Sequence, residues 1–209
     1  MIDSIILDVD GTLWDSTPEF ALVFNTMLGK KYPEIKEKVT AEQLRNVFGL
    51  TLDVIGAELF QSVPKKQAEQ MAYEFSEQVY PYLAEHGAML YEGWKETLNA
   101  LSKKYKLFIV SNCQEGYIQC FFKAYPYLEQ YFIDFEYPGR SGKLKADNIK
   151  MVVERNHLKS PIYVGDTKGD AKAAKEAGIP FIYARYGFGE VREYDDVIDS
   201  PIELMSRFL

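Results

Sequence analysis

Hydrophobic residues follow two different patterns along this chain, and the change comes near residue 90. Between residues 18 and 87, apolar positions recur at intervals of three and four, which is typical of amphipathic helices, and no strand pattern is clear. The clearest series is Phe20, Val23, Phe24, Met27 and Leu28. Thr40 and Gln43 predict a capping box at a helix start, and Pro64 suits the first turn of a further helix. This segment is therefore predicted to be entirely helical.

Beyond residue 93 the pattern becomes an alternation of helices and short apolar strands. The expected helices are 94–105, 115–125, 148–156 and 170–177, and the expected strands are 106–111, 132–137, 162–165 and 180–183. The apolar run Ile5-Ile6-Leu7 predicts a further strand near the N-terminus. Alternation of this kind indicates a parallel sheet with helices on both faces.

The predicted fold class is therefore α/β, with a doubly wound, Rossmann-like parallel-sheet core and an inserted α-helical cap domain. Residues 1–16 and 91–209 would form the core, and residues 17–90 would form the cap. The hinges would lie near residues 15–17 and 91–93.

Composition and charge narrow the classes of partner. The 209 residues are 47% hydrophobic, which is ample for a packed core, and the net charge of −7 argues against nucleic-acid or anionic-membrane binding. Aspartates interrupt the first residues, so no leader pattern is evident, and no stretch approaches a membrane span. Two cysteines do not suggest a disulfide framework. We expect a cytoplasmic protein, whose oligomeric state the sequence does not specify.

Carboxylates gather where the predicted strands end. Asp8 and Asp10 close the first strand and point the same way, and Asp166 and Asp170 form a G-D-x-x-x-D pattern after a later strand. Carboxyl ends of parallel strands meet at one edge of a sheet, so these groups should lie close together. Crowded carboxylates need a cation to stay ionised, and a set rich in oxygen ligands favours Mg²⁺.

Four motifs in this order resemble the haloacid dehalogenase-like hydrolase superfamily, and in particular its phosphoglycolate phosphatase-like branch with a helical cap. They are D-x-D-G-T-L from Asp8, Ser111-Asn112, a lysine at position 143 or 145, and G-D-x-x-x-D from Gly165. The resemblance implies a Mg²⁺-dependent phosphatase that hydrolyses a small phosphate monoester through an aspartyl-phosphate intermediate.

The resemblance also implies roles for single residues. Asp8 would be the nucleophile and Asp10 the general acid and base. The metal site would use Asp8, the backbone carbonyl of Asp10, Asp166 as a direct ligand, and Asp170 as a direct or indirect one.

The same resemblance implies a phosphate-binding set that follows two other strands. The hydroxyl of Ser111 would contact phosphoryl oxygens, helped by Asn112 and the backbone amides of the loop after it. For the required lysine, the K-x-x-N-I setting favours Lys145, whereas a G-K-type loop would favour Lys143.

Other functions stay open on the sequence alone. A phosphomutase of the β-phosphoglucomutase type shares every core motif. A dehalogenase needs neither Asp10 nor Mg²⁺, and a phosphonatase needs a cap lysine, for which Lys30 and Lys31 are available. A non-catalytic phospho-receiver or interaction module could use the same acidic pocket. The intact pair of aspartates and the large insertion favour the phosphatase, and the physiological substrate is not specified.

Overall fold

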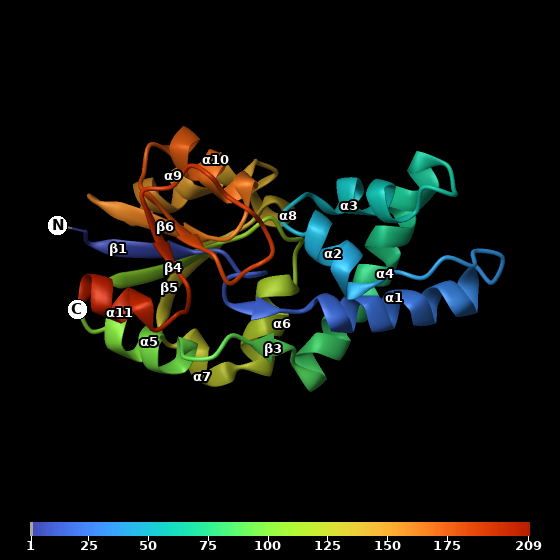
Figure 1. The fold of residues 1–209 in the computed structure, drawn as a ribbon, viewed down its shortest axis with the longest axis horizontal. Helices are drawn as coiled ribbons and strands as arrows, with labels where there is room; N and C mark the ends of the chain where they lie inside the picture. Colours follow the sequence, from blue (N-terminus) through green and yellow to red (C-terminus); the bar gives the residue numbers. More distant parts are fainter. Residues whose placement is uncertain (1) are drawn as a thin grey trace.

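A computed structural model describes residues 2–209, and its centre is a six-stranded sheet in the order β5-β4-β1-β6-β7-β8 (Figure 1). Every neighbouring pair runs parallel. In chain order these strands are β1 (Ser4–Leu7), β4 (Lys106–Val110), β5 (Phe132–Glu136), β6 (Pro161–Gly165), β7 (Phe181–Ala184) and β8 (Asp196–Ile198). The predicted parallel α/β class is confirmed.

Helices cover both faces of this sheet. Side chains alternate along β1, so that Ile6 packs in a cluster with α9 (Lys145–Arg155) and α10 (Lys168–Ala177). Ile5 and Leu7 face a larger cluster on the opposite side. Its covering helices are α5 (Trp94–Leu101), α6 (Tyr117–Ala124) and α11 (Glu203–Phe208). The core is therefore doubly wound, as predicted.

The segment between residues 16 and 88 contains four helices and no strand of the sheet. It contains α1 (Thr17–Lys31), α2 (Ala41–Val47), α3 (Leu52–Leu59) and α4 (Lys65–His86), which lie together beside the sheet (Figure 1). The expected capping box is present, because the Thr40 side chain accepts from the Gln43 amide while the Gln43 side chain accepts from the Thr40 amide. Pro64 is the residue directly before α4. We call α1 to α4 the helical region.

The two chain crossings that lead into and out of the helical region run side by side. They form a short antiparallel ribbon from β2 (Trp14–Asp15) and β3 (Met89–Leu90), with Trp14 opposite Leu90. The helical region is thus joined to the sheet by two paired strands.

Element boundaries depart from the expected ones in several places. The helix expected over 94–105 ends at Leu101, the one expected over 115–125 covers Tyr117–Ala124, and the one expected over 148–156 begins at Lys145. The ribbon strands, β8, α7 (Pro126–Glu129), α8 (Pro138–Ser141) and α11 were not expected. Elements this short contain less than two full periods of the hydrophobic pattern, so they leave little periodic signal.

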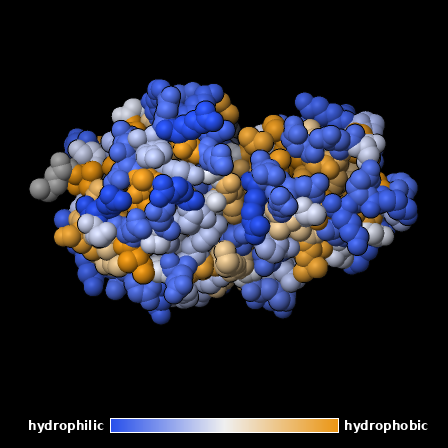
Figure 2. Space-filling model, viewed as in Figure 1, coloured by the Kyte–Doolittle hydropathy of each residue, from blue (hydrophilic) through white to orange (hydrophobic). Residues whose placement is uncertain are grey.

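The surface and the cysteines add two observations. Polar residues dominate the visible face, and a waist separates the sheet side from the helical region (Figure 2). Within residues 2–209, helices long enough to cross a bilayer lack the necessary apolar stretch. Cys113 and Cys120 are both buried free thiols.

Candidate active site

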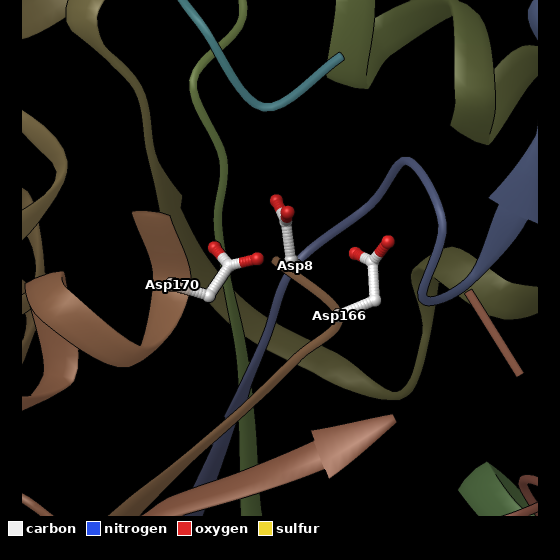
Figure 3. A group of neighbouring side chains, drawn as sticks. All are labelled: Asp8, Asp166 and Asp170. Atoms are coloured by element: carbon white, nitrogen blue, oxygen red, sulfur yellow. The ribbon is translucent and has the colours of Figure 1, made fainter. Parts of the chain in front are cut away.

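Three aspartates converge at the carboxyl edge of the sheet. Leu7 of β1 pairs with Val164 of β6, so the residues after each strand, Asp8 and Asp166, emerge side by side. Asp170 comes from the first turn of α10. One carboxylate oxygen of each aspartate lies within 4.8 Å of the others, and Figure 3 shows the three side chains gathered around one point. All three residues are almost completely buried.

Asp166 is held by a tight backbone cradle. Its Oδ2 accepts from the Phe188 amide at 2.7 Å, and its Oδ1 accepts from the Thr12 hydroxyl at 3.2 Å. A Cβ on Gly11, whose φ is +74°, would lie 2.1 Å from Asp166 Oδ2, and a Cβ on Gly187 would lie 2.3 Å from Asp166 Cβ. Burial, reinforced by the charges of the two neighbouring aspartates, raises the pKa of Asp166 well above its usual range.

Lys145 brings the positive charge to this cluster. Its Nζ lies 2.6 Å from Asp170 Oδ1 and 3.1 Å from Asp8 Oδ2, and only 4% of the side chain is exposed. Burial alone would lower the pKa of Lys145, but the two carboxylates raise it above its usual value, so the ammonium stays charged. Lys143, by contrast, lies exposed in the loop before α9. Of the two lysines that the sequence left open, Lys145 is the one in contact with the aspartates.

Both oxygens of Asp170 already have partners. Oδ1 accepts from Lys145, and Oδ2 accepts from the Thr167 amide at 2.9 Å and the Thr167 hydroxyl at 2.7 Å. This is a capping box at the start of α10. Burial would raise the pKa of Asp170, but Lys145 and the hydrogen bonds from Thr167 hold it below its usual value. The arrangement suits a residue that positions Lys145 rather than one that binds a metal directly.

Asp8 has one engaged oxygen and one free oxygen. Oδ2 contacts Lys145, whereas Oδ1 is buried without a hydrogen-bond partner within residues 2–209. Burial raises the pKa of Asp8 to about 6 even though Lys145 opposes the shift. A buried, unpartnered carboxylate oxygen beside Asp166 fits a hard divalent cation, because such an ion prefers oxygen ligands and would satisfy both groups.

The carboxylate of Asp10 lies outside this cluster, in a pocket of its own. Its Oδ1 accepts from the indole of Trp14 at 3.1 Å, from the hydroxyl of Ser16 at 2.8 Å and from the hydroxyl of Tyr117. Burial raises the pKa of Asp10 to about 7, although these hydrogen bonds oppose the shift. A part for Asp10 in a metal site would therefore come from its backbone carbonyl. Tyr117 was not found by sequence reasoning, because a tyrosine in α6 matches no motif.

Ser111 and Asn112 follow β4, the strand next to β1, so they reach the same edge of the sheet. Ser111 is buried there. The Asn112 side chain turns away from the aspartates, because its Nδ2 donates to the Gly49 carbonyl at 2.8 Å. Gly49 lies between α2 and α3, so Asn112 links the sheet to the helical region. Its backbone amide, rather than its side chain, remains for a phosphoryl group.

A cavity of about 40 Å³ lies beside Asp10, between the loop after β4 and the helical region. It is lined on one side by Asp10, Asn112, Cys113, Gln114 and Tyr117. The helical region contributes Phe20, Phe48, Gly49, Leu50, Leu52, Ile55, Ser76 and Tyr80. The waist in Figure 2 marks the boundary between these two sides.

Comparison with known proteins identifies the family of this chain. A model of the haloacid dehalogenase-like hydrolase family matches residues 5–184. The chain belongs to this family. A phosphoglycolate phosphatase from Vibrio parahaemolyticus is 29% identical over 221 residues, covering 98% of this chain and 95% of the relative.

Solved structures have the same fold. A haloacid dehalogenase-like hydrolase from Streptococcus pneumoniae superposes with a TM-score of 0.85 at 25% identity, covering 100% of this chain and 99% of the other. A predicted phosphoglycolate phosphatase from Haemophilus somnus gives 0.86 at 21% identity, covering 100% and 98%. The family match, together with the phosphatase relatives, shows that this chain is a phosphatase.

Proposed function

We propose that this enzyme hydrolyses a small phosphate monoester with the help of Mg²⁺ and forms an aspartyl-phosphate on Asp8. The observation that carries this proposal is the divided environment of the Asp8 carboxylate. One oxygen is fixed by Lys145 at 3.1 Å, and the other is buried beside Asp166 with no hydrogen-bond partner in the described part of the chain. Relatives named phosphoglycolate phosphatase support a small phosphorylated substrate.

Asp8 and Asp10 divide the first step between them. An oxygen of Asp8 attacks phosphorus while the bond from phosphorus to the ester oxygen breaks. Asp10 gives its proton to the departing oxygen, so that an alcohol leaves rather than an alkoxide. Within residues 2–209, the side-chain hydrogen bonds received by Asp10 reach Oδ1, so Oδ2 would carry this proton.

The second step releases phosphate. A water molecule attacks phosphorus in the aspartyl-phosphate, Asp10 takes the proton of that water, and the bond to Asp8 breaks. Lys145 and the hydroxyl of Ser111 would hold the phosphoryl oxygens in both steps. Lys145 suits this task because its ammonium is kept charged and is fixed by Asp170.

The chain's metal ligands would be carboxylate oxygens of Asp8 and Asp166 together with the carbonyl of Asp10. Mg²⁺ bound there supplies charge neutralisation for the phosphoryl oxygens. Asp170 would act indirectly, because Thr167 and Lys145 already occupy its oxygens.

We also propose that the helical region is a cap, with residues 17–90 as the cap domain and residues 1–16 and 91–209 as the core. The cavity between the two sides would hold the leaving group and limit the access of water during the transfer.

The test uses Asp8→Asn, which keeps the shape of the side chain but cannot attack phosphorus. Hydrolysis of nitrophenyl phosphate in the presence of Mg²⁺ should fall by about a thousandfold or more. Circular dichroism should show an unchanged fold. Retained activity would show that Asp8 is not the nucleophile. Wild-type activity that does not change when a chelator is added would remove the metal from the proposal.

Incubation of the wild type with glucose 1-phosphate tests the mutase alternative, which requires glucose 6-phosphate rather than free phosphate as the product.

A further inference from the structure

The cavity beside Asp10 contains no cationic side chain among its described lining residues. Its walls on the helical region are mainly apolar, with Phe20, Phe48 and Ile55 among them. Asp10 is the one carboxylate among the lining residues that the structure describes, so the charge that faces a bound leaving group is negative or neutral.

Neutral polar groups point to the kind of partner that the cavity would accept. Ser76 lies on α4, is only 2% exposed and lines the cavity, and its Oγ has no hydrogen-bond partner within residues 2–209. Tyr80, one turn further along α4, also lines the cavity. Burial raises the pKa of Tyr80 well above its usual value, so its hydroxyl stays neutral and can donate. Uncharged groups of this kind pair well with a hydroxyl.

The nearby cations are already engaged elsewhere. Lys145 lies between Asp8 and Asp170, and Arg45 of α2 makes an ion pair with Asp15 at 2.7 Å. A carboxylate on the leaving group would therefore be taken out of water close to Asp10 without a countercharge. Burying an unpaired charge in this way is strongly unfavourable.

We infer that the leaving group of the substrate is a small, uncharged alcohol with a further hydroxyl, and that the enzyme discriminates against leaving groups that carry a carboxylate. This inference rests on the proposed phosphatase function. The cavity of about 40 Å³ has room for about three water-sized groups, which fits a leaving group of a few carbon atoms. Selectivity would therefore differ from what the names of the phosphoglycolate phosphatase relatives suggest.

A matched pair of substrates tests the inference. Phosphoglycolate and 2-hydroxyethyl phosphate share a carbon skeleton and differ in whether the end of the leaving group is a carboxylate or a hydroxyl. With Mg²⁺ and wild-type enzyme, we expect kcat/KM for 2-hydroxyethyl phosphate to exceed that for phosphoglycolate by about tenfold or more.

A variant then adds the missing charge. Leu50 lines the cavity and is 43% exposed, so Leu50→Lys can be introduced with little risk to the fold. It should raise kcat/KM for phosphoglycolate by about fivefold, mainly through a lower KM, and so lower the ratio of kcat/KM for 2-hydroxyethyl phosphate to that for phosphoglycolate. Val54→Lys is the control, because Val54 is 38% exposed and lies outside the cavity lining. It adds the same charge and should leave the ratio within about twofold of the wild type.

The wild-type ratio decides the inference even if the variants do not fold. Equal or faster hydrolysis of phosphoglycolate would overturn it and leave the phosphatase proposal intact. Failure of the wild type to hydrolyse even nitrophenyl phosphate would overturn the proposed function and, with it, this inference.

Discussion

The sheet side of the molecule and the helical region carry different kinds of residue. On the sheet side, Asp8, Asp166, Asp170 and Lys145 form a compact charged group with nearly every oxygen fixed. The residues that the helical region contributes to the cavity beside Asp10 are mainly aromatic or aliphatic, with a few neutral polar groups. The charged groups come from strand ends and first turns of helices, where backbone hydrogen bonds set positions closely. Under the proposed function, the reaction and the choice of substrate would belong to structurally separate parts, so that the first could stay constant while the second varies.

The comparison is tested most severely by replacing Lys145 with Met. Turnover should fall by about a hundredfold or more, because the phosphoryl oxygens lose their fixed positive charge. The free energy of unfolding should fall by about 3 kcal/mol, since Asp8 and Asp170 are left buried without a cation. Steady-state assays and urea titrations measure the two effects. Lys143→Met is the matched control and should change neither, and the opposite ranking would move the phosphate-binding role to Lys143.

Tyr117→Phe tests whether the neutral hydroxyl next to Asp10 contributes to the reaction. The variant keeps the ring that packs against Trp14 and Phe20 but removes the hydroxyl that donates to Asp10. We expect kcat to fall by about tenfold, because Asp10 is less firmly positioned, with little change in KM.

Its control is Tyr125→Phe. Tyr125 also packs against Trp14, but its hydroxyl donates to the Ala88 carbonyl, away from the aspartates. A similar fall in kcat for both variants would show that loss of any tyrosine hydroxyl near Trp14 is enough, and that Tyr117 has no particular part.

Arg45→Gln examines the junction between the two sides. Arg45 of the helical region contacts Asp15 of the connecting ribbon through Nε at 3.0 Å and Nη2 at 2.7 Å. The free energy of unfolding should fall by about 1 kcal/mol, since the arginine is partly exposed, while kcat changes by less than about twofold. Lys65→Gln, which removes an exposed pair with Glu69, should have almost no effect on unfolding. A large loss of kcat in Arg45→Gln would show that the junction controls the reaction.

The smallest expected effect concerns a second acidic group, at the end of β5. Burial would raise the pKa of Glu136, but hydrogen bonds from Arg140 and Arg155 hold it below the usual 4.5. The resulting stabilisation is present above pH 4.5 and is lost as the pH falls through the lower pKa of the folded state. Thermal unfolding near pH 6 and at lower pH should show that Glu136→Gln loses less stability on acidification than the wild type, by less than about 1 kcal/mol. An identical loss in both proteins would contradict the argument. The charge of Glu136 is thus balanced by arginines of the chain itself, whereas Lys145 alone does not balance the charges of the aspartate cluster.

The strand-end residues could be predicted because local sequence determines them. An apolar run followed by acidic residues specifies a strand and what it presents, and parallel pairing brings the tips of several strands together. The same logic gave the α/β class and the helical insertion. The resemblance to the hydrolase superfamily favoured Lys145, which the structure places against Asp8 and Asp170. The roles assigned to these residues stay predictions until variants are assayed.

The lining of the cavity beside Asp10 could not be predicted in this way. Ser76 and Tyr117 come from α4 and α6, and their meeting at the cavity depends on how separate helices pack. Spacing within one segment carries no information about such an encounter. The Asn112 side chain shows the same limit, because its bond to Gly49 spans a long stretch of sequence. Two-residue strands such as β2 and β3 escape detection because their partner strand, rather than their own composition, defines them.

Asp170 serves the start of α10 and the position of the lysine through the same carboxylate. Anyone who redesigns the chain for heat resistance would normally optimise helix starts first. At residues 167 to 170 that strategy would lower activity, because a substitution that preserves the helix start could still remove the contact between Asp170 and the Lys145 ammonium group. Heat resistance should therefore be engineered at other helix starts, where turnover is not at risk. One example is α2, where the Thr40 cap bonds to Gln43 of the same helix.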